Sequence, residues 1–450
     1  MCKKITVLFV MGIYIKAVYS QPQLVWSKTY WCPIAYDMIC DKNGYIYFTG
    51  TDMENVYTVK ISPQGNILWQ SKVDLIPNSM DWGMTMVLNE EENILYVAGG
   101  GGIDINFFDL YVLKYNANTG DTIWVKSFDL YADDIARDME FWNDKIVIAG
   151  HSPDFLGNEI VYPFICIIDT NGNLITYQFY GFSTAASAFW NIKPYVNKFY
   201  LCGKLYDYYT NFAGFLTCKI DNSLNVIWAK DTLIIVPFQM LDGGEELDIL
   251  NTSGEIVVNG ILSENNSIRS HWVVFKYDTL GNLIWKKDFG RGQGYGCKVD
   301  LFASNIFLCG RSLTGSFQIL YLTPSGDTLW SQLAFPNATP QSIRNYCFRV
   351  TGNADSLFFY VIGELDSDSV IINKYFYGCT ECETQVQEKE PKNLPLLYKV
   401  PNLFHNSTLF IDKNFYLYDV TGKKLKGMNK KGIYFLKNKE ENKKFKIVKF

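Results

Sequence analysis

The feature that most constrains the fold is a glycine that recurs at the end of seven β-rich segments. Each segment is a short run of aliphatic and aromatic residues, such as YIYFTG or KIVIAG, that closes on glycine. Successive glycines are 49, 51, 53, 57, 50 and 53 residues apart, at Gly50, Gly99, Gly150, Gly203, Gly260, Gly310 and Gly363. A steady period of about 50 residues predicts a repeat architecture, either a propeller or a solenoid.

A second motif recurs between these glycines, as a polar turn followed by a strand that carries tryptophan. The stretches KISPQGNILWQSKVD, KIDNSLNVIWAKDT and KYDTLGNLIWKKDFG share this shape. Asn, Gly and Asp between two apolar strands are typical of β-hairpin turns. Hardly any segment has the apolar period of a helix. The sequence therefore predicts an all-β fold, and about four strands per repeat favour propeller blades over a β-helix.

The first tryptophan strand, LVWSKTY around Trp26, stands alone before the first complete repeat. The last repeat ends with SVIINKYFYG and has no tryptophan strand of its own. Pairing between these two segments would close the ring and remove the exposed sheet edges. We therefore expect a seven-bladed β-propeller, closed by an N-terminal strand, over residues 21–380. The tryptophan of each repeat is expected to pack between blades. In the third repeat, Thr176 stands at the tryptophan position.

These repeats resemble the secreted β-propeller repeats of bacterial surface proteins. More loosely, NANTGDTIW is similar to the tryptophan-docked blades of pyrroloquinoline-quinone dehydrogenases. The resemblance covers residues 24–378 through turn and packing positions, so it implies a fold and says little about activity. The quinone-dependent dehydrogenase is the weakest functional hypothesis, because no adjacent cysteine pair or calcium cluster accompanies the tryptophans.

Residues 1–20 have the pattern of a secretory signal peptide, with two lysines, an apolar run and small or β-branched residues before Gln21. The apolar run from Ile5 to Ile15 is too short to span a bilayer, which requires about 20 residues in a helix. We therefore expect a secreted protein without a transmembrane anchor.

The C-terminal segment differs in composition from the rest of the chain. Residues 381–395 are polar and charged, which is typical of a linker. Residues 396–450 carry 13 lysines against 4 acids, a net charge of +9, whereas residues 1–395 sum to −14. Such a difference suggests separate roles for the two parts. Short strands are expected around 415–420, 432–437 and 445–450.

This tail resembles the C-terminal sorting domain of the type IX secretion system. The resemblance rests on Pro401-Asn402, YDVTGK at 418–423, GIYFLK at 432–437 and the terminal KIVKF. It implies a small β-sandwich-like domain, the type IX secretion machinery as partner, and passage across the outer membrane. The propeller would then be released or held at the cell surface. The alternative is a small basic β-sandwich that packs on the propeller.

Composition argues against several classes of partner and cofactor. A pI near 5.4 and a net charge of −5 disfavour a nucleic-acid partner, which requires a basic face. The three histidines fall in different parts of the chain without metal-site spacing. Most cysteines lie in apolar runs and are interpreted as small buried hydrophobes; only Cys379 and Cys382 are closely spaced. We expect no metal, no cofactor and no defined catalytic residue.

Binding is expected on the face that carries the longer and more variable loops between strands two and three and between blades. Its candidate ligand residues are Asp81, Trp82, Asp133, Asp134, Trp190 and Tyr295. Loops rich in aromatic residues, Asp and Asn suit a glycan or a peptide. The primary interpretation is a secreted or cell-surface binding module.

The alternative is a carbohydrate-active enzyme, either a glycoside hydrolase or a lyase. Such an enzyme would need two convergent carboxylates about 5 to 10 Å apart. The candidates are Asp81, Asp133, Asp134, Asp242, Glu245 and Glu246. Turn acids that cap backbone amides would have the same pattern, so the sequence leaves both interpretations open.

Overall fold

The computed structural model shows a chain built from β-strands and their connections. It describes residues 5–8, 14–17, 21–101, 108–131, 133–154, 160–182, 186–207, 212–235, 243–250, 252–263, 270–299, 304–312, 316–336, 349–353, 356–365, 368–378, 415–419, 424–425, 432–438 and 444–449. No helix occurs in these ranges, which confirms the all-β prediction for them. They accordingly contain no helix that could cross a membrane.

The chain divides into two compact units, and the larger one, Gln21–Phe376, holds the repeats. Its described residues form seven four-stranded antiparallel sheets, numbered here in chain order. Sheets 1, 2, 3 and 7 are separate, whereas sheets 4, 5 and 6 are continuous. Sheets 4 and 5 are joined by one residue pair between β17 and β20, and sheets 5 and 6 share the long strand β23.

Sheet 1 consists, in order, of β4 (Ile34–Cys40), β5 (Ile46–Thr51), β6 (Val56–Ile61) and β7 (Ile67–Val73). Sheet 2 consists of β8 (Trp82–Asn89), β9 (Ile94–Gly101), β10 (Asp109–Asn116) and β11 (Thr122–Phe128). Sheet 3 consists of β12 (Ile135–Trp142), β13 (Lys145–Asp154), β14 (Ile160–Asp169) and β15 (Leu174–Phe179). Sheet 4 consists of β16 (Ala186–Tyr195), β17 (Lys198–Asp207), β18 (Phe212–Asp221) and β19 (Val226–Ile235). Sheet 5 consists of β20 (Gly243–Ile249), β21 (Ile256–Ser263), β22 (Ser270–Tyr277) and β23 (Leu283–Val299). Sheet 6 begins with the same β23 and continues with β24 (Ile306–Ser312), β25 (Phe317–Leu322) and β26 (Thr328–Leu333). Sheet 7 consists of β27 (Arg349–Asn353), β28 (Ser356–Glu364), β29 (Ser369–Gly378) and the N-terminal β3 (Gln23–Trp31).

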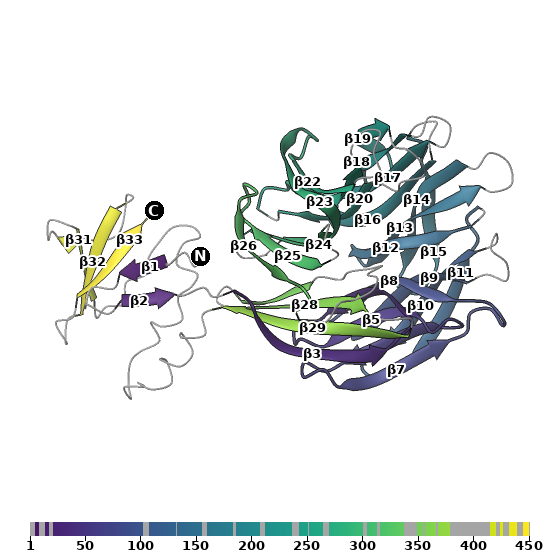
Figure 1. Ribbon diagram of the computed structural model, residues 1–450, viewed down its shortest axis with the longest axis horizontal. Helices are drawn as coiled ribbons and strands as arrows, with labels where there is room; N and C mark the ends of the chain where they lie inside the picture. Colours follow the sequence, from purple (N-terminus) through teal and green to yellow (C-terminus); the bar gives the residue numbers. More distant parts are fainter. Residues whose placement is uncertain are drawn as a thin grey trace. The chain divides into compact units, whose positions relative to one another are not determined.

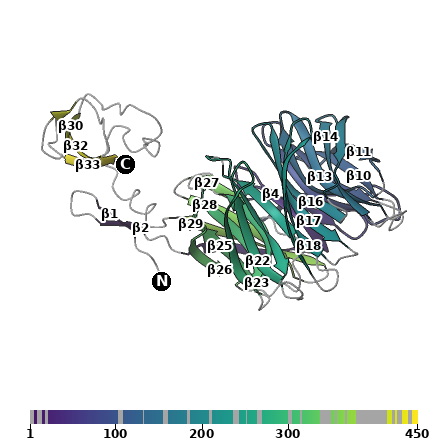
Figure 2. The same cartoon turned by 90° about the horizontal axis from the view of Figure 1, so that it is seen from above.

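The first strand of each sheet is its inner strand and the fourth is its outer strand. Figure 1 shows β8, β12, β16 and β20 toward the middle of the larger unit, with β7, β11, β19 and β26 at its outside. Seen from above in Figure 2, β16, β17 and β18 lie beside one another, as their hydrogen-bond registers require. Side chains on the inner strands of different sheets therefore come close together.

The first six repeat glycines, from Gly50 to Gly310, lie in the second strand of their sheets, each opposite a β-bulge in the inner strand. In sheet 1, Gly50 pairs with Ala35, and the register shifts directly after that pair. A Cβ atom on Gly50 would lie 1.9 Å from the carbonyl oxygen of Ile34. The equivalent distances are 1.8 Å at Gly99, 2.1 Å at Gly150, 1.9 Å at Gly203 and 2.1 Å at Gly260. Glycine recurs because the inner-strand carbonyl occupies the space where a side chain would begin.

Neighbouring sheets are joined on their outer side by a repeated lysine and tryptophan pair. In sheet 1, Lys60 lies opposite Trp69 on the adjacent strand. Both side chains donate to the carbonyl oxygen of Ala117 in sheet 2, at 2.9 and 3.1 Å. The same arrangement joins sheet 4 to sheet 5 and sheet 5 to sheet 6, through Lys219 and Trp228 to Thr279 and through Lys276 and Trp285 to Pro324. In these three cases the turn before the tryptophan strand of one sheet supplies the acceptor for the preceding sheet.

The N-terminal strand takes the position of the tryptophan strand in sheet 7. Strand β3 pairs with β29, and Trp26 lies opposite Lys374, as Figure 1 shows for the two strands. Trp26 Nε1 and Lys374 Nζ donate to the carbonyl oxygen of Pro63 in sheet 1, at 3.0 and 3.2 Å. The expected pairing of the opening strand with the last repeat is therefore present, and it makes the same contact as sheets 1, 4 and 5.

The hydrophobic core lies mainly between neighbouring sheets. One buried cluster packs Phe48 of sheet 1 with Ile362 of sheet 7, and another packs Tyr96 of sheet 2 with Met139 of sheet 3. Free cysteines contribute to this core as predicted: Cys166, Cys202, Cys218 and Cys309 are fully buried. Cys379 and Cys382 lie outside the described residues.

The smaller unit contains the two chain ends, Met1–Ser20 and Tyr377–Phe450. Near the N-terminus, β1 (Ile5–Leu8) pairs antiparallel with β2 (Tyr14–Ala17). The tail forms one sheet in the order β31-β30-β32-β33, made of β30 (Phe415–Asp419), β31 (Lys424–Leu425), β32 (Gly432–Asn438) and β33 (Lys444–Lys449). The three strands expected in the tail correspond to β30, β32 and β33.

The contact at the repeat glycine predicts a stability effect for Gly50→Ala. The added methyl would meet the Ile34 carbonyl, so the inner strand must shift, which costs about 1–3 kcal/mol of unfolding free energy. Gly181→Ala is the matched control, because a Cβ there would meet no atom within 4 Å. Denaturant unfolding of both variants measures the difference. Equal stability of the two would contradict this explanation of the repeat.

Candidate functional site

Six equivalent side chains extend from the bulges of the inner strands, and we call them the bulge residues. Each one follows the residue that pairs with its repeat glycine, at the point where the register shifts. They are Tyr36, Met84, Arg137, Trp190, Glu245 and Tyr295. All six have intermediate solvent exposure. A bulge redirects a side chain from the regular alternation of a strand, which brings these residues together.

The bulge residues lie near the beginning of their inner strands. In sheets 1, 2, 3 and 5 the bulge is the third residue of the strand, as for Tyr36 in β4 (Ile34–Cys40). The connections from the preceding sheets arrive at this end. It is the end at which the sequence predicts the variable loops, so the bulge residues belong to the predicted binding face.

Trp190 is the centre of a charged group among the bulge residues. The guanidinium carbon of Arg137 lies 4.2 Å from the centre of its ring, and Lys204 Nζ lies 3.9 Å from it. Lys204 forms an ion pair with Glu245 at 2.7 Å. Cations over an indole ring are stabilised by its negative face, and more so when they are desolvated. Side chains from three sheets therefore form one cation and aromatic cluster.

The ionisation of this cluster follows from burial. Burial lowers the pKa of Arg137 to about 10, and the charge of Glu245 opposes that shift, so the guanidinium stays charged at neutral pH. His151, whose Nδ1 accepts a bond from Arg137 Nε at 3.5 Å, has a pKa well below its usual value. Its burial is the main cause, and the neighbouring cations Arg137 and Lys204 add to it. His151 is therefore neutral at physiological pH.

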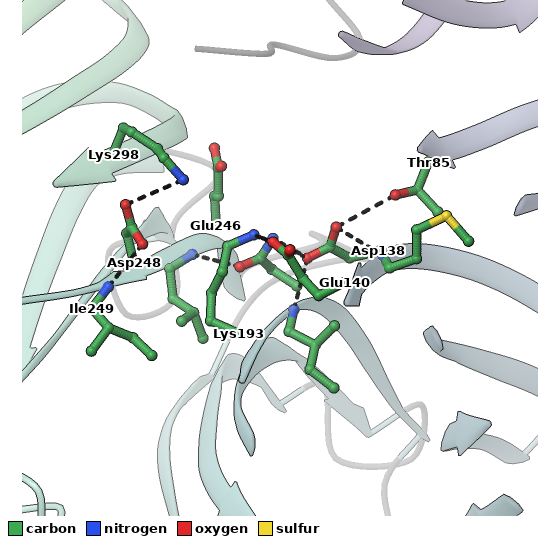
Figure 3. Close-up of polar contacts among 12 residues, drawn as sticks. Thr85, Asp138, Glu140, Lys193, Glu246, Asp248, Ile249 and Lys298 are labelled. Atoms are coloured by element: carbon green, nitrogen blue, oxygen red, sulfur yellow. Dashed lines mark hydrogen bonds and ion pairs between the residues drawn. The ribbon is translucent and has the colours of Figure 1, made fainter. Parts of the chain in front are cut away.

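In the first five sheets, the residue after the bulge residue links its inner strand to a neighbouring one, and we call this set the relay residues. Asp138 is the example in Figure 3: its Oδ2 accepts the backbone N–H of Ile192 in the following sheet at 2.9 Å. Three further relay residues also accept a backbone N–H from the following sheet. Asp37 accepts that of Met86 at 2.8 Å, Asn191 that of Leu247 at 3.1 Å and Glu246 that of Cys297 at 2.9 Å. Thr85 instead donates its hydroxyl to Asp138 at 3.4 Å. These bonds fix the spacing of the inner strands below the bulge residues.

Ion pairs lie two residues further along the same strands. Figure 3 shows Lys193 with Glu140, and Lys298 with Asp248 at 3.4 Å. Burial raises the pKa of Asp138 to about 6, while nearby Lys193 lowers it and Glu140 raises it. The relay residues and these pairs are already engaged with one another, so their evident role is to hold the inner strands in register.

The predicted acids Asp81, Asp133 and Asp134 lie in connections between sheets, and all three are buried. Asp81 accepts the backbone N–H groups of Leu75 and Ile76 and the hydroxyl of Ser79. These bonds satisfy its carboxylate within its own loop.

Asp133 and Asp134 bind backbone amides in the same way. Asp133 accepts the N–H of Phe108 at 2.9 Å, and Asp134 accepts those of Leu130 and Tyr131. Burial raises the pKa of Asp133 and raises that of Asp134 to about 6. The structure thus places these acids as organisers of the loops. Asp242 lies outside the described residues.

The predicted aromatic residues occupy two different environments. Trp82 packs against Phe108 at a ring distance of 4.9 Å, next to Gly100. Trp190 and Tyr295, in contrast, are both bulge residues, and the hydroxyl of Tyr295 donates to Gln293. After burial, the charge of Glu245 is the largest influence on Tyr295, and both raise its pKa. The structure therefore brings Trp190, Tyr295 and Glu245 into one neighbourhood.

Sequence reasoning missed Arg137, Lys204 and His151. A signal for the first of them exists, because every bulge residue lies 13 to 15 residues before its repeat glycine. The variable offset conceals the equivalence until the strand register is known. Lys204 and His151 directly follow the repeat glycines of their own sheets, which brings them beside the bulge.

Metal binding gains no support from this arrangement. Across the described residues, no group of three or more His, Cys, Asp or Glu side chains is placed to hold an ion. The one neutral imidazole of the cluster, His151, is adjacent to two cations, which would oppose a metal ion.

Comparisons with known proteins do not assign a family. No protein-family model matches the chain, and no curated protein sequence is similar to it. Among solved structures, a tryptophan-to-alanine variant of the Synechocystis apocarotenoid oxygenase aligns with a TM-score of 0.39 and 9% identity. The alignment covers 64% of this chain and 69% of that chain. A score of this size carries no conclusion about fold or activity.

Proposed function

We propose that the larger unit is a closed seven-bladed β-propeller and that the chain is a secreted or cell-surface binding module. The closed ring is supported by contacts between all consecutive sheets, including the last and the first. Sheets 6 and 7 meet through Trp330 and Phe359, whose rings are stacked 6.3 Å apart. Sheets 7 and 1 meet through Trp26, which donates to Pro63. An open row of sheets would leave these end contacts unmade.

The binding role is supported by one observation, the cluster of Arg137, Trp190, Lys204 and Glu245 among the bulge residues. These side chains keep partial exposure on a rigid scaffold, whereas the relay residues below them are engaged in holding the inner strands. Aromatic rings beside fixed polar groups are typical of sites that bind small ligands or glycans. We therefore propose the bulge residues as the ligand site.

The tail is proposed to direct export by the type IX secretion system. Support comes from the motifs at 401–402, 418–423 and 432–437 and from the terminal KIVKF. The motif at 432–437 lies within β32, and the motif at 418–423 begins in β30, which pairs with β32. With a signal peptide at residues 1–20, the protein would reach the cell exterior in two steps.

Ring closure predicts that Trp26→Phe and Trp69→Phe have equal effects. Each change keeps an aromatic ring but removes one N–H donor to a carbonyl of the next sheet, which costs about 1 kcal/mol of unfolding free energy. Denaturant unfolding of the two variants gives the comparison. If Trp26→Phe is neutral while Trp69→Phe destabilises, the N-terminal strand does not close the ring.

The export proposal predicts that removal of residues 396–450 retains the protein inside the outer membrane. Fractionation and immunoblotting in a bacterium with a working type IX system would locate the shortened and full chains. A strain without that machinery is the control, in which both chains should stay in the periplasm. Export of the shortened chain would overturn the proposal.

The binding proposal predicts that the full chain gives discrete signals on glycan or peptide arrays. Trp190→Ala should abolish them, because Trp190 is the centre of the cluster. Trp31→Ala is the matched control: Trp31 lies on the outer strand β3 and is 48% exposed. Thermal unfolding of each variant shows that it is folded. Silence of the unmodified chain on both arrays, or unchanged signals from Trp190→Ala, would refute the binding role of this site.

A further inference from the structure

Arg137 is a half-buried cation whose hydrogen-bonding capacity is mostly unused among the described residues. Its one hydrogen bond there runs from Nε to His151 Nδ1 at 3.5 Å. Lys204 is matched by Glu245, but no carboxylate of the described residues lies within ion-pair distance of Arg137. A guanidinium presents five N–H donors in a planar fork, so its two terminal nitrogens are available to a ligand.

Trp190 supplies a second unused donor in the same place. Its Nε1 is buried and has no hydrogen-bond partner among the described residues. A buried donor without a partner is unfavourable, and a hydrogen bond to a ligand oxygen would remove that cost. The ring of Trp190 lies against the Arg137 guanidinium, so both donors belong to one small region.

The charges of this region select the kind of anion. Lys204 and Glu245 compensate each other and His151 is neutral, so Arg137 leaves one positive charge unmatched. A phosphate ester would bring a second negative charge close to the Glu245 carboxylate, and a sulfate ester would bring an additional oxygen close to it. Both contacts would be repulsive. A carboxylate carries one charge in a plane that matches the guanidinium fork. One carboxylate is therefore the complementary group.

We propose that the bulge residues bind the carboxylate of a uronic acid residue in an acidic glycan. Arg137 donates to the carboxylate from its terminal nitrogens, and Trp190 Nε1 donates to an adjacent oxygen of the same sugar. The rings of Tyr36 and Tyr295, at equivalent bulges, supply apolar surface for the sugar ring. This inference rests on the proposed binding function and names its ligand class.

The test is calorimetric titration of the full chain with trimers of galacturonic, glucuronic and mannuronic acid. The methyl ester of each trimer is the matched ligand, because it keeps the shape and removes the charge. At least one acid should bind, and its ester should bind at least tenfold more weakly. Acetate and the free monosaccharide acid form a further arm, and binding of acetate as tight as that of the trimer would overturn the assignment to a sugar.

Variants assign the effect to individual donors. Arg137→Met should weaken binding of the acidic trimer at least tenfold, and Arg137→Lys should have a smaller effect because it keeps the charge but loses the fork. Trp190→Phe keeps an aromatic ring and removes the N–H donor. Its affinity for the acidic trimer should fall about three- to tenfold, as expected for the loss of one hydrogen bond. Lys230→Met, an exposed cation on outer strand β19, should have no effect.

The outcomes separate this inference from the binding function itself. Equal binding of acid and ester, or unchanged binding by a folded Arg137→Met variant, would overturn the carboxylate assignment. Array signals for other ligands together with no binding of any uronic trimer would also overturn it, while leaving the binding function in place. Silent arrays would instead refute the binding function.

Discussion

The close approach of an inner-strand carbonyl to a glycine in the second strand is the constraint on which the rest of the structure depends. At Gly50 and Gly203 the space of a Cβ atom is taken by the carbonyl oxygens of Ile34 and Ala188. The residue that follows is then extra in the ladder and becomes a bulge. One steric relation thus produces both the sequence period and the set of bulge residues that forms the candidate site.

A second repeated interaction holds the sheets beside one another. A lysine and a tryptophan from adjacent strands donate to one carbonyl oxygen in the next sheet, as Lys60 and Trp69 do at Ala117. Trp26 and Lys374 make this contact although they are far apart in the chain. The outer pairs and the inner relay residues act at opposite edges of each sheet, so together they fix its position. Inner strands held in this way can present charged side chains in a defined arrangement without help from the loops.

The fold was more predictable than the site, for a physical reason. Strand pattern, turn residues and the isolated Trp26 are local signals, and they were sufficient to predict the sheets and the pairing of β3 with β29. Of the candidate residues, Trp190 and Tyr295 lie at bulges, but Asp81 and Asp134 hold backbone amides of their loops. Sequence cannot distinguish a loop acid that faces a ligand from one that caps amides, because the difference lies in the path of the loop. Arg137 was missed because the offset between a bulge residue and its repeat glycine varies from 13 to 15 residues, so the equivalence emerges only from the strand register.

The sequence by itself determined the repeat, the strand order and the unequal charge of the two parts of the chain, because these follow from residue spacing and composition. Only the tertiary structure decided which side chains meet at the inner strands. Arg137, Trp190 and Lys204 come from three different strands of sheets 3 and 4, and Glu245 from sheet 5. Their proximity depends on the register shift at each bulge and on the packing of one sheet against the next. Both are set by backbone geometry across strands, which no local pattern records.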